Sequence, residues 1–260
     1  MAHTPAPFDP AVPAPARIYD YLLRGKDNYP ADREAASRAI AAIPDLPELA
    51  RANRAFLTRS VRAAAGAGVT QFLDLGAGIP TSPNVHETAR RLQPAARIAY
   101  VDNDPVVLAH SRAERRAPGT HVIQADIRDP AAVLAAVSGP LDLTRPVAIL
   151  LISVLHFISG DLQPLISRYK DAVPPGSWLA ISHAASDGAD PLQVSEVADA
   201  YRHGPADPQA RTTAEIRALF TGWNLRDDPP GLADVREWAG LPAASGHVHL
   251  SMPAGTATKP

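Results

Sequence analysis

The sequence predicts an α/β fold of the doubly wound kind, in which helices cover both faces of a mostly parallel sheet. Two observations lead to this prediction. From Val69 onward, short apolar runs alternate with amphipathic helical stretches, which is typical of parallel strands buried on both faces. Helix starts are repeatedly marked by a short polar residue followed by proline. The runs expected to form buried strands are 69–75, 97–101, 120–125, 147–154 and 177–182.

Before the predicted sheet, residues 15–68 are expected to form an all-helical extension, or cap. Apolar residues recur there at three- and four-residue intervals, and Gly66 and Gly68 end the stretch. In this architecture such a segment commonly folds over the mouth of the ligand site. Its polar and aromatic run makes Tyr21 and Asn28 candidates for a lid, although a packed helix with tyrosine hydroxyls at its rim is an equal alternative.

Within the predicted core, four polar–proline pairs are expected to begin helices: Ser82-Pro83, Asp104-Pro105, Asp129-Pro130 and Asp190-Pro191. Thr212 and Glu215 have the spacing of a capping box before a further apolar helix. Two later segments, 223–226 and 247–252, are expected to form an antiparallel hairpin at one edge. With these segments the predicted sheet has seven strands.

We divide the chain into a disordered tail over 1–14, a single domain over 15–252 and a second disordered tail over 253–260. The first tail is rich in proline and alanine, and the second offers small residues and prolines without a periodic apolar face. Within the domain, the cap occupies 15–68 and the core 69–252.

Composition excludes several classes of function. The formal charge of −2 gives no net attraction to phosphate backbones, so we expect no nucleic-acid partner. The chain has no cysteine, which excludes disulfides, thiolate nucleophiles and cysteine metal sites. The longest apolar run, 147–155, is too short to cross a bilayer. We expect a soluble cytoplasmic protein, a monomer or homodimer, that acts on a small molecule.

The most informative segment is a buried strand that runs into a glycine turn at Gly76-Ala77-Gly78. Glycines there permit a tight turn and close approach of a ligand to the backbone. A dinucleotide site would want a third glycine where Thr81 stands, and would gain nothing from Asp74 before the turn. A carboxylate at this place suits a ligand with an ammonium and a sulfonium better than a pyrophosphate. The segment therefore favours S-adenosylmethionine over NAD.

Two further acids follow the next two strands. Asp102, followed by Asn103, can accept hydrogen bonds from both ribose hydroxyls. Asp126 can accept one from an adenine amino group, while Ile127 offers its amide to the ring. An acid after a strand alone is more often a helix cap or turn residue. Three of them at three consecutive strand ends, together with the glycine turn, indicate a cofactor site.

The chain resembles the class I S-adenosylmethionine-dependent methyltransferases, and within them an actinobacterial group first described as a domain of unknown function. The segments that carry the resemblance are Pro15–Tyr29, Asn53–Leu57, Gln71–Gly76, Pro80–His86, Tyr100–Pro105, Leu155–Ile158, Pro230–Leu232 and Trp238. The resemblance implies a Rossmann-like fold and the cofactor, but no substrate. One departure is Arg24, where the group usually has glycine. The expected cofactor residues are Asp74, Gly76, Ala77, Gly78, Asp102, Asn103, Asp126, Ile127, Ser153, Tyr21 and Asn28.

Methyl transfer needs alignment of donor and acceptor, and a base helps where the acceptor is a hydroxyl or a protonated amine. His156 and His183 follow the fourth and fifth predicted strands and are candidate bases, with buried structural histidines as the alternative. Tyr201 is a candidate for the acceptor pocket. His247 and His249 have no nearby acids in the sequence, so we expect no metal site.

These observations predict a methyltransferase that acts on a hydroxyl or amine of a small molecule. The alternatives are an S-adenosylmethionine-binding accessory or regulatory protein without catalysis, and a nicotinamide oxidoreductase. Asp74 and Thr81 argue against the oxidoreductase.

Overall fold

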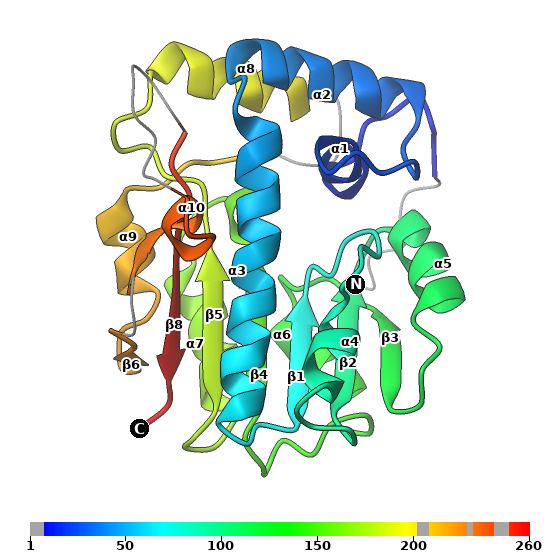
Figure 1. Cartoon of the computed structure of the whole chain (residues 1–260), viewed down its shortest axis with the longest axis vertical. Coiled ribbons are helices and arrows are strands. Elements are labelled where there is room, and N and C mark those ends of the chain that lie inside the picture. Colours follow the sequence, from blue (N-terminus) through cyan, green and yellow to red (C-terminus); the bar gives the residue numbers. More distant parts are fainter. Residues whose placement is uncertain (1–7, 202–207, 228–230, 242–249) are drawn as a thin grey trace.

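The computed structural model describes residues 8–201, 208–227, 231–241 and 250–260. Its sheet has eight strands in the order β3-β2-β1-β4-β5-β8-β6, with β7 paired to β8 (Figure 1). The first five strands are parallel, and β8 runs antiparallel to its neighbours. The strands are β1 Gln71–Leu75, β2 Arg97–Asp102, β3 Thr120–Gln124, β4 Ala148–Ile152, β5 Trp178–Ser182, β6 Asn224–Leu225, β7 Ala233–Asp234 and β8 Pro253–Thr258. The five predicted parallel strands are confirmed, with bounds that differ by at most two residues.

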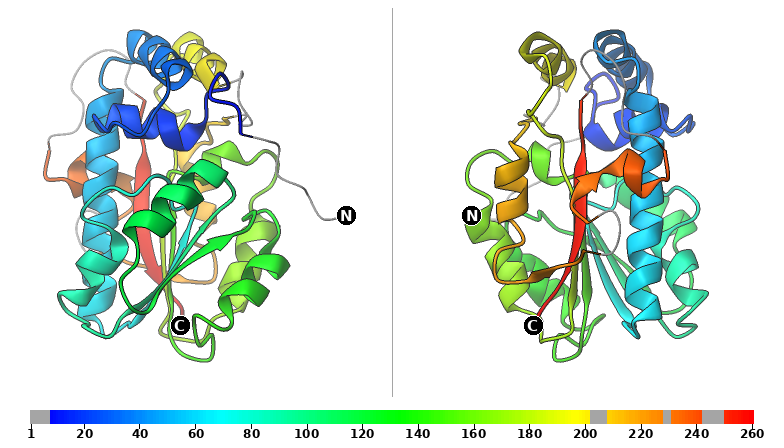
Figure 2. Two further views of the ribbon diagram at one scale, coloured as in Figure 1. Left: turned by 90° about the vertical axis from the view of Figure 1, so that its right-hand side faces the viewer. Right: turned by 60° about the vertical axis from the view of Figure 1, so that its left-hand side comes forward.

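Helices cover both faces of the sheet because successive strand residues point to opposite sides. In β1, Phe72 packs in one apolar cluster with Phe56, whereas Leu73 packs in another with Val133 and Tyr169. Figure 2 shows the two helical layers on either side of the sheet. The helices of the core are α4 Val85–Arg90, α5 Pro105–Glu114, α6 Pro130–Val137, η1 Leu155–Phe157, α7 Gln163–Asp171, α8 Pro191–Tyr201, α9 Thr213–Ala218 and α10 Val235–Trp238. The doubly wound, Rossmann-like fold is therefore confirmed.

The predicted helical cap is present as α1 Pro15–Leu22, α2 Pro30–Ala42 and α3 Leu46–Gly66. Figure 1 shows α1, α2 and α8 beyond the carboxyl ends of the parallel strands, whereas α3 runs along one face of the sheet. A buried ion pair between Arg17 Nε and Asp32 Oδ2, 2.9 Å apart, joins α1 to α2. Helix α3 is fixed to the core in part by an edge contact between Phe56 and Trp238, whose ring centroids are 5.1 Å apart.

The two predicted tails were wrong where the structure describes them. Residues 253–258 form β8, which lies between β5 and β6 in the sheet. At the other end, Ala14 is buried and its amide donates to Asp32 Oδ1 at 2.9 Å. The predicted hairpin partner of 223–226 was also wrong, because Asn224 and Leu225 pair with β8; of that expected strand, 247–249 lie outside the described residues.

Three of the four predicted helix starts are confirmed. The side chains of Asp104, Asp129 and Asp190 accept hydrogen bonds from amides in the first turns of α5, α6 and α8. The fourth was wrong: α4 begins at Val85, and its N-cap is Asn84, whose amide donates to the side chain of the third helical residue, a glutamate. Within the described part of the chain, no helix has the length and apolarity needed to cross a membrane.

Candidate functional site

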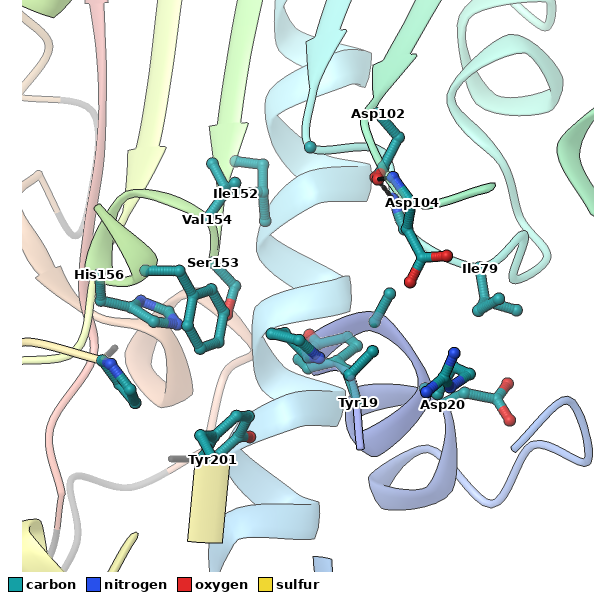
Figure 3. Close-up of a pocket in the computed structure, with 18 of the residues that line it drawn as sticks. Tyr19, Asp20, Ile79, Asp102, Asp104, Ile152, Ser153, Val154, His156 and Tyr201 are labelled. Atoms are coloured by element: carbon teal, nitrogen blue, oxygen red, sulfur yellow. Dashed lines mark hydrogen bonds between the residues drawn. The ribbon is translucent and has the colours of Figure 1, made fainter. Parts of the chain in front are cut away.

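A cavity of about 720 Å³ lies at the carboxyl ends of the parallel strands, beneath the cap. The strand order reverses between β1 and β4, and Gly76 and Ser153, which follow these two strands, both line the cavity. Open α/β sheets bind their ligands at such a reversal. Figure 3 shows Asp102 on one side of the cavity and His156 and Tyr201 on the other.

The glycine turn after β1 presents bare backbone to this cavity. Gly76 has φ +77°, and a Cβ there would lie 2.4 Å from Cγ2 of Val154. The amides of Gly76 and Ala77 donate to the carbonyl of Val101 at 2.9 and 3.1 Å, which fastens the turn to β2. Gly78 has φ +59°, and no atom lies within 4 Å of the position that its Cβ would take. All three turn residues line the cavity, and their contact with a cofactor stays a prediction.

Asp74, on β1, lines the cavity and is only 5% exposed. No residue in the described part of the chain donates a hydrogen bond to its carboxylate. Burial raises the pKa of Asp74 to about 6, and the positive charges of Arg115 and Arg54 oppose that rise. A cationic group entering the cavity would supply the partner that this carboxylate lacks.

Asp102, at the end of β2, accepts hydrogen bonds from two backbone amides. Its Oδ2 accepts from Gly78 at 2.9 Å and its Oδ1 from Asp104 at 3.0 Å. Burial raises the pKa of Asp102. Because a carboxylate has about four acceptor positions, each oxygen keeps capacity for one further donor such as a ribose hydroxyl. Asn103 also lines the cavity.

Asp126 and Ile127, after β3, line the same cavity. Arg128 already binds Asp126: its Nε lies 3.0 Å from each carboxylate oxygen, and its Nη2 lies 2.5 Å from Oδ2. The carbonyl of Ile127 accepts from the Tyr169 hydroxyl at 2.7 Å. The structure thus brings the three strand-end acids to one cavity, but Asp126 has less free acceptor capacity than Asp74. The contact of Asp126 with adenine stays a prediction.

His156 lies in η1, directly after β4, and lines the cavity. The preceding Ser153 has φ +55°, and its amide donates to Ser182 Oγ at 3.0 Å, which turns the chain after the strand. No hydrogen-bond partner for either ring nitrogen of His156 is found within the described residues. Burial, followed by the charges of His183 and Arg211, lowers the pKa of His156 well below 6.5. The ring is therefore neutral at neutral pH, and because Nδ1 is buried, Nε2 is the nitrogen left for a ligand in the cavity.

His183 has a structural position instead. It is fully buried and does not line the cavity. Its Nδ1 lies 2.8 Å from the carbonyl of Ala184, and its Nε2 lies 2.9 Å from Arg211 Nη1. Burial lowers the pKa of His183 to about 4. Because both ring nitrogens are engaged, the prediction of His183 as a catalytic base was wrong.

The cap lines the cavity through residues other than those predicted. Neither Tyr21 nor Asn28 lines it, which contradicts the predicted contacts. Tyr21 packs against Ile18 between the cap helices, whereas Tyr19 and Asp20 face the cavity (Figure 3). Asn28 contacts the cavity-lining Asp20 instead: its Nδ2 donates to Asp20 Oδ2 at 2.7 Å.

Comparison with known proteins shows the family. The sequence profile of the S-adenosyl methyltransferase family matches residues 1–260. The chain belongs to this family. The resemblance inferred from the sequence motifs is therefore confirmed, and S-adenosylmethionine is the cofactor of this family.

Individual relatives agree with this family. A DUF574-family protein from Streptomyces avermitilis has 40% identity and a TM-score of 0.88, covering 97% of this chain and 99% of that one. A Thermobifida fusca protein, provisionally named a methyltransferase, has 39% identity and a TM-score of 0.85, covering 96% of each chain. A Mycobacterium marinum protein, provisionally named an S-adenosyl-L-methionine-dependent methyltransferase, is 30% identical over 203 residues, or 70% of this chain. The chain spans 56% of the length of that curated relative.

The residues at the cavity fit the cofactor of the methyltransferase family. Asp74 offers a carboxylate without a donor to a ligand that carries an ammonium and a sulfonium. Gly78 leaves open space where a side chain would stand, and Asp102 keeps acceptor capacity for ribose hydroxyls. These residues would hold the methionyl and ribose portions.

Sequence reasoning missed three residues that shape this site. Tyr19 and Asp20 lay within the polar and aromatic run of the cap, so the segment was found but its facing residues were not. No motif or spacing in the sequence pointed to Arg115 as part of the site. Its guanidinium stacks on the Tyr100 ring, 3.9 Å from the centroid, and its Nη2 donates to the carbonyl of Ala77 at 3.3 Å. It thereby contacts the backbone of the glycine turn.

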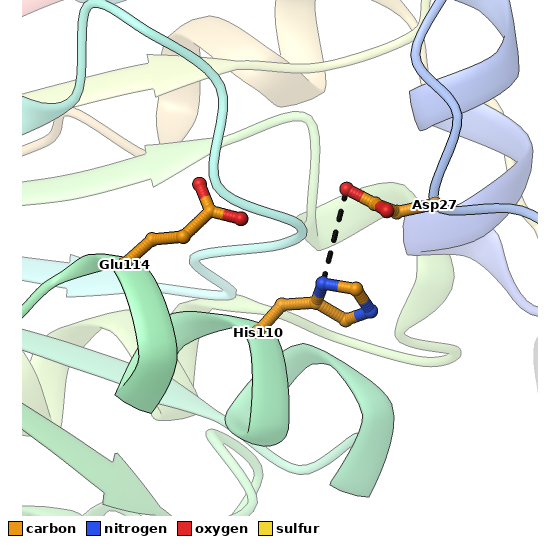
Figure 4. Close-up of side chains that lie close together, drawn as sticks. All are labelled: Asp27, His110 and Glu114. Carbon is orange, nitrogen blue, oxygen red and sulfur yellow. Dashed lines mark ion pairs between the residues drawn. The ribbon is translucent and has the colours of Figure 1, made fainter.

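A separate cluster joins the cap to the core. The Oδ2 of Asp27, in the connection after α1, lies 3.8 Å from Nδ1 of His110 on α5 (Figure 4). Glu114 follows one helical turn later, and the nearest ligand-type atoms of the three side chains lie within 4.8 Å of one another. Glu114 is exposed, and exposed acidic groups often lie together without an ion. We therefore interpret this cluster as a contact between the cap and the core and do not propose a metal site.

Proposed function

We propose that the chain binds S-adenosylmethionine in this cavity and transfers its methyl group to a hydroxyl or amine of a small molecule. The observation that carries the proposal is Asp74, a buried carboxylate without a donor at the point where the strand order reverses. A cationic ligand would give the buried carboxylate the partner of opposite charge that it lacks. The family match supports the same ligand.

The cofactor supplies a methyl carbon that the sulfonium has already activated. The residues of the chain then need to align the acceptor with that carbon and exclude water. The acceptor oxygen or nitrogen forms its bond to the methyl carbon while the carbon–sulfur bond breaks and leaves its electron pair on sulfur. The proton of the acceptor passes to Nε2 of His156, because Nδ1 is buried and the ring is neutral.

The alternative of an accessory protein without catalysis predicts a cavity that ends at the cofactor. Here the cavity continues past β4 to Tyr201 on α8, which supports the enzyme. A nicotinamide oxidoreductase receives no support, because Asp74 would face its pyrophosphate.

Isothermal titration with S-adenosylhomocysteine tests the binding half of this proposal. We expect the wild-type protein to bind, and Asp102→Asn to bind about tenfold or more weakly, because a charged acceptor to the ribose hydroxyls is lost. Asp171→Asn, which changes an exposed carboxylate on α7, is the matched control and should bind as the wild type does. Absence of binding to the wild-type protein would refute the proposal.

His156→Ala tests the chemical half. We expect S-adenosylhomocysteine to bind this variant with unchanged affinity, while transfer to an accepted substrate slows by about 10²–10⁴-fold. An unchanged rate would exclude His156 as the base while leaving methyl transfer possible.

A further inference from the structure

The cavity divides into a charged part and a neutral part. Its described charged lining residues all lie between Asp9 and Arg128, in the cap and after β1, β2 and β3. From Ile152 to Met252, the described lining residues include no aspartate, glutamate, lysine or arginine. Because β4, β5 and β8 lie on the other side of β1 from β2 and β3, the two parts occupy opposite halves of the cavity. The neutral half faces away from the predicted ribose and adenine contacts.

An aromatic wall forms one side of the neutral half. The rings of His156 and Phe157 are 4.3 Å apart between centroids, and those of Phe157 and Tyr201 are 5.4 Å apart. Aliphatic side chains from α8 and from the segment before β8 line the same half: Val194, Val197, Leu250 and Met252. Flat aromatic surfaces favour stacked or edge contacts with another ring.

Two polar groups on this wall have unused hydrogen-bonding capacity. No hydrogen bond is found for the His156 ring or for the Tyr201 hydroxyl within the described residues. Burial raises the pKa of Tyr201 and lowers that of His156, so both are neutral at neutral pH. Buried polar groups normally have partners, and here a ligand bearing one neutral polar group would provide them.

We propose that the methyl acceptor is a neutral aromatic compound whose hydroxyl group receives the methyl. This inference rests on the proposed function and narrows its acceptor. A carboxylate, phosphate or ammonium entering the neutral half would be buried without a charged partner among the described lining residues, at a cost that a neutral ring avoids. An aromatic hydroxyl also suits a weak base such as His156. The pKa of an aromatic hydroxyl is about 10, far below the value of roughly 16 for water, so its proton is removed more easily.

The test uses three probes that share a naphthalene ring and differ in the charge of its substituent: 2-naphthol, 2-naphthoate and 2-naphthylmethylammonium. Each is titrated calorimetrically into protein saturated with S-adenosylhomocysteine, near pH 7.5. We expect 2-naphthol to bind about tenfold or more tightly than either charged probe. The readout is binding and does not depend on turnover.

A variant tests whether the probes bind in the neutral half of the cavity. Val197→Asp places a carboxylate in the cavity lining; it should weaken 2-naphthol about tenfold and strengthen the ammonium probe. Leu192→Asp makes the same change on the same helix at a side chain that is 74% exposed, and it should leave all three affinities unchanged. If Val197→Asp fails to fold, Tyr201→Phe replaces it, with an expected loss of about three- to tenfold in 2-naphthol affinity.

Two results would overturn the acceptor proposal. One is a charged probe that binds as tightly as 2-naphthol, and the other is protein that binds S-adenosylhomocysteine but none of the probes. Failure of S-adenosylhomocysteine to bind would refute the proposed function instead. In that case the ligand-free protein is titrated with the same probes, and preference for 2-naphthol still decides the character of the neutral half.

Discussion

Replacing Asp74 with asparagine should stabilise the ligand-free protein while weakening its hold on the cofactor. The carboxylate is buried without a donor within the described residues, so its negative charge opposes folding. The side chain of asparagine is of the same size and carries no charge. Opposite effects on stability and binding are typical of a residue that serves a ligand at the expense of the fold.

The magnitude follows from the pKa of Asp74. A rise from the ordinary 3.8 to about 6 corresponds to about 3 kcal/mol at 1.36 kcal/mol per pKa unit. Between these two values the folded protein retains a proton that the unfolded chain has lost, so this residue makes stability fall as the pH rises. We therefore expect Asp74→Asn to gain about 3 kcal/mol near pH 7.5 and about half of that near pH 5.

Urea unfolding of the ligand-free protein at these two pH values measures the gain. Titration with S-adenosylhomocysteine measures the opposite effect, an expected loss of about 10- to 100-fold in affinity as the ammonium loses its counter-charge. Asp171→Asn, at an exposed carboxylate, should change stability by less than about 0.5 kcal/mol. A loss of stability in Asp74→Asn near pH 7.5, or a gain that is the same at both pH values, would refute the reasoning.

Three further predictions concern the fold around the site. Gly76→Ala should lower the free energy of unfolding by about 2–4 kcal/mol in urea, because φ is +77° and the new Cβ would meet Val154; wild-type stability would contradict this. The pKa of His183 is lowered from 6.5 to about 4, so its contribution to stability is present above pH 6.5 and about 3 kcal/mol is lost as the pH falls to 4. His183→Asn should show a smaller loss between about pH 7.5 and pH 4.5 in urea unfolding, and a pH profile identical to that of the wild type would count against this. Deleting residues 253–258 should abolish cooperative unfolding, followed by near-ultraviolet circular dichroism, because β8 bonds to β5, β6 and β7; a retained cooperative transition would disprove it.

The parallel half of the sheet was predictable because its strands are short apolar runs, and β1, β4 and β5 are buried along almost their whole length. Their apolar runs stand out from the amphipathic helices between them, and the strand ends could be placed within two residues. Asp74, Asp102 and Asp126 follow from the same logic, since parallel strands bring their carboxyl ends to one edge. The strand order that makes this edge a cavity was not among the predictions, because no single residue encodes it.

β8 was not predicted as a strand because it consists of small residues, which its packing requires. Its sequence, with Gly255 at the third position, has no large apolar side chain. A Cβ on Gly255 would already lie 3.1 Å from Leu232 and 3.4 Å from Leu225 and Phe220. The bulk that fills this part of the core comes from its neighbours, so the strand itself resembles a flexible tail in sequence.

The cap shows a different limit of sequence reasoning. The polar and aromatic run identified the segment, but which residues face the cavity depends on the phase of a short helix. α1 ends at Leu22, and successive residues on it point about 100° apart, so Tyr19 and Tyr21 face different surroundings. Asn28 lies in the following loop and reaches the site only through Asp20. No local pattern contains these orientations, because the packing of α1 on α2 and α3 sets them.

The two candidate histidines show why strand ends alone do not identify a base. His156 and His183 each follow a parallel strand. His156 lies in η1 and lines the cavity. His183 instead contacts Arg211, from the segment before α9, through its Nε2. The same guanidinium donates to the carbonyls of Ile158 and Gly160, after η1. One half-buried cation therefore holds the chain after η1 and also engages the ring of His183. Asp74, Asp102 and Asp126 come directly from strands or strand ends, and this difference explains why sequence reasoning brought those three acids to the cavity but could not separate the two histidines.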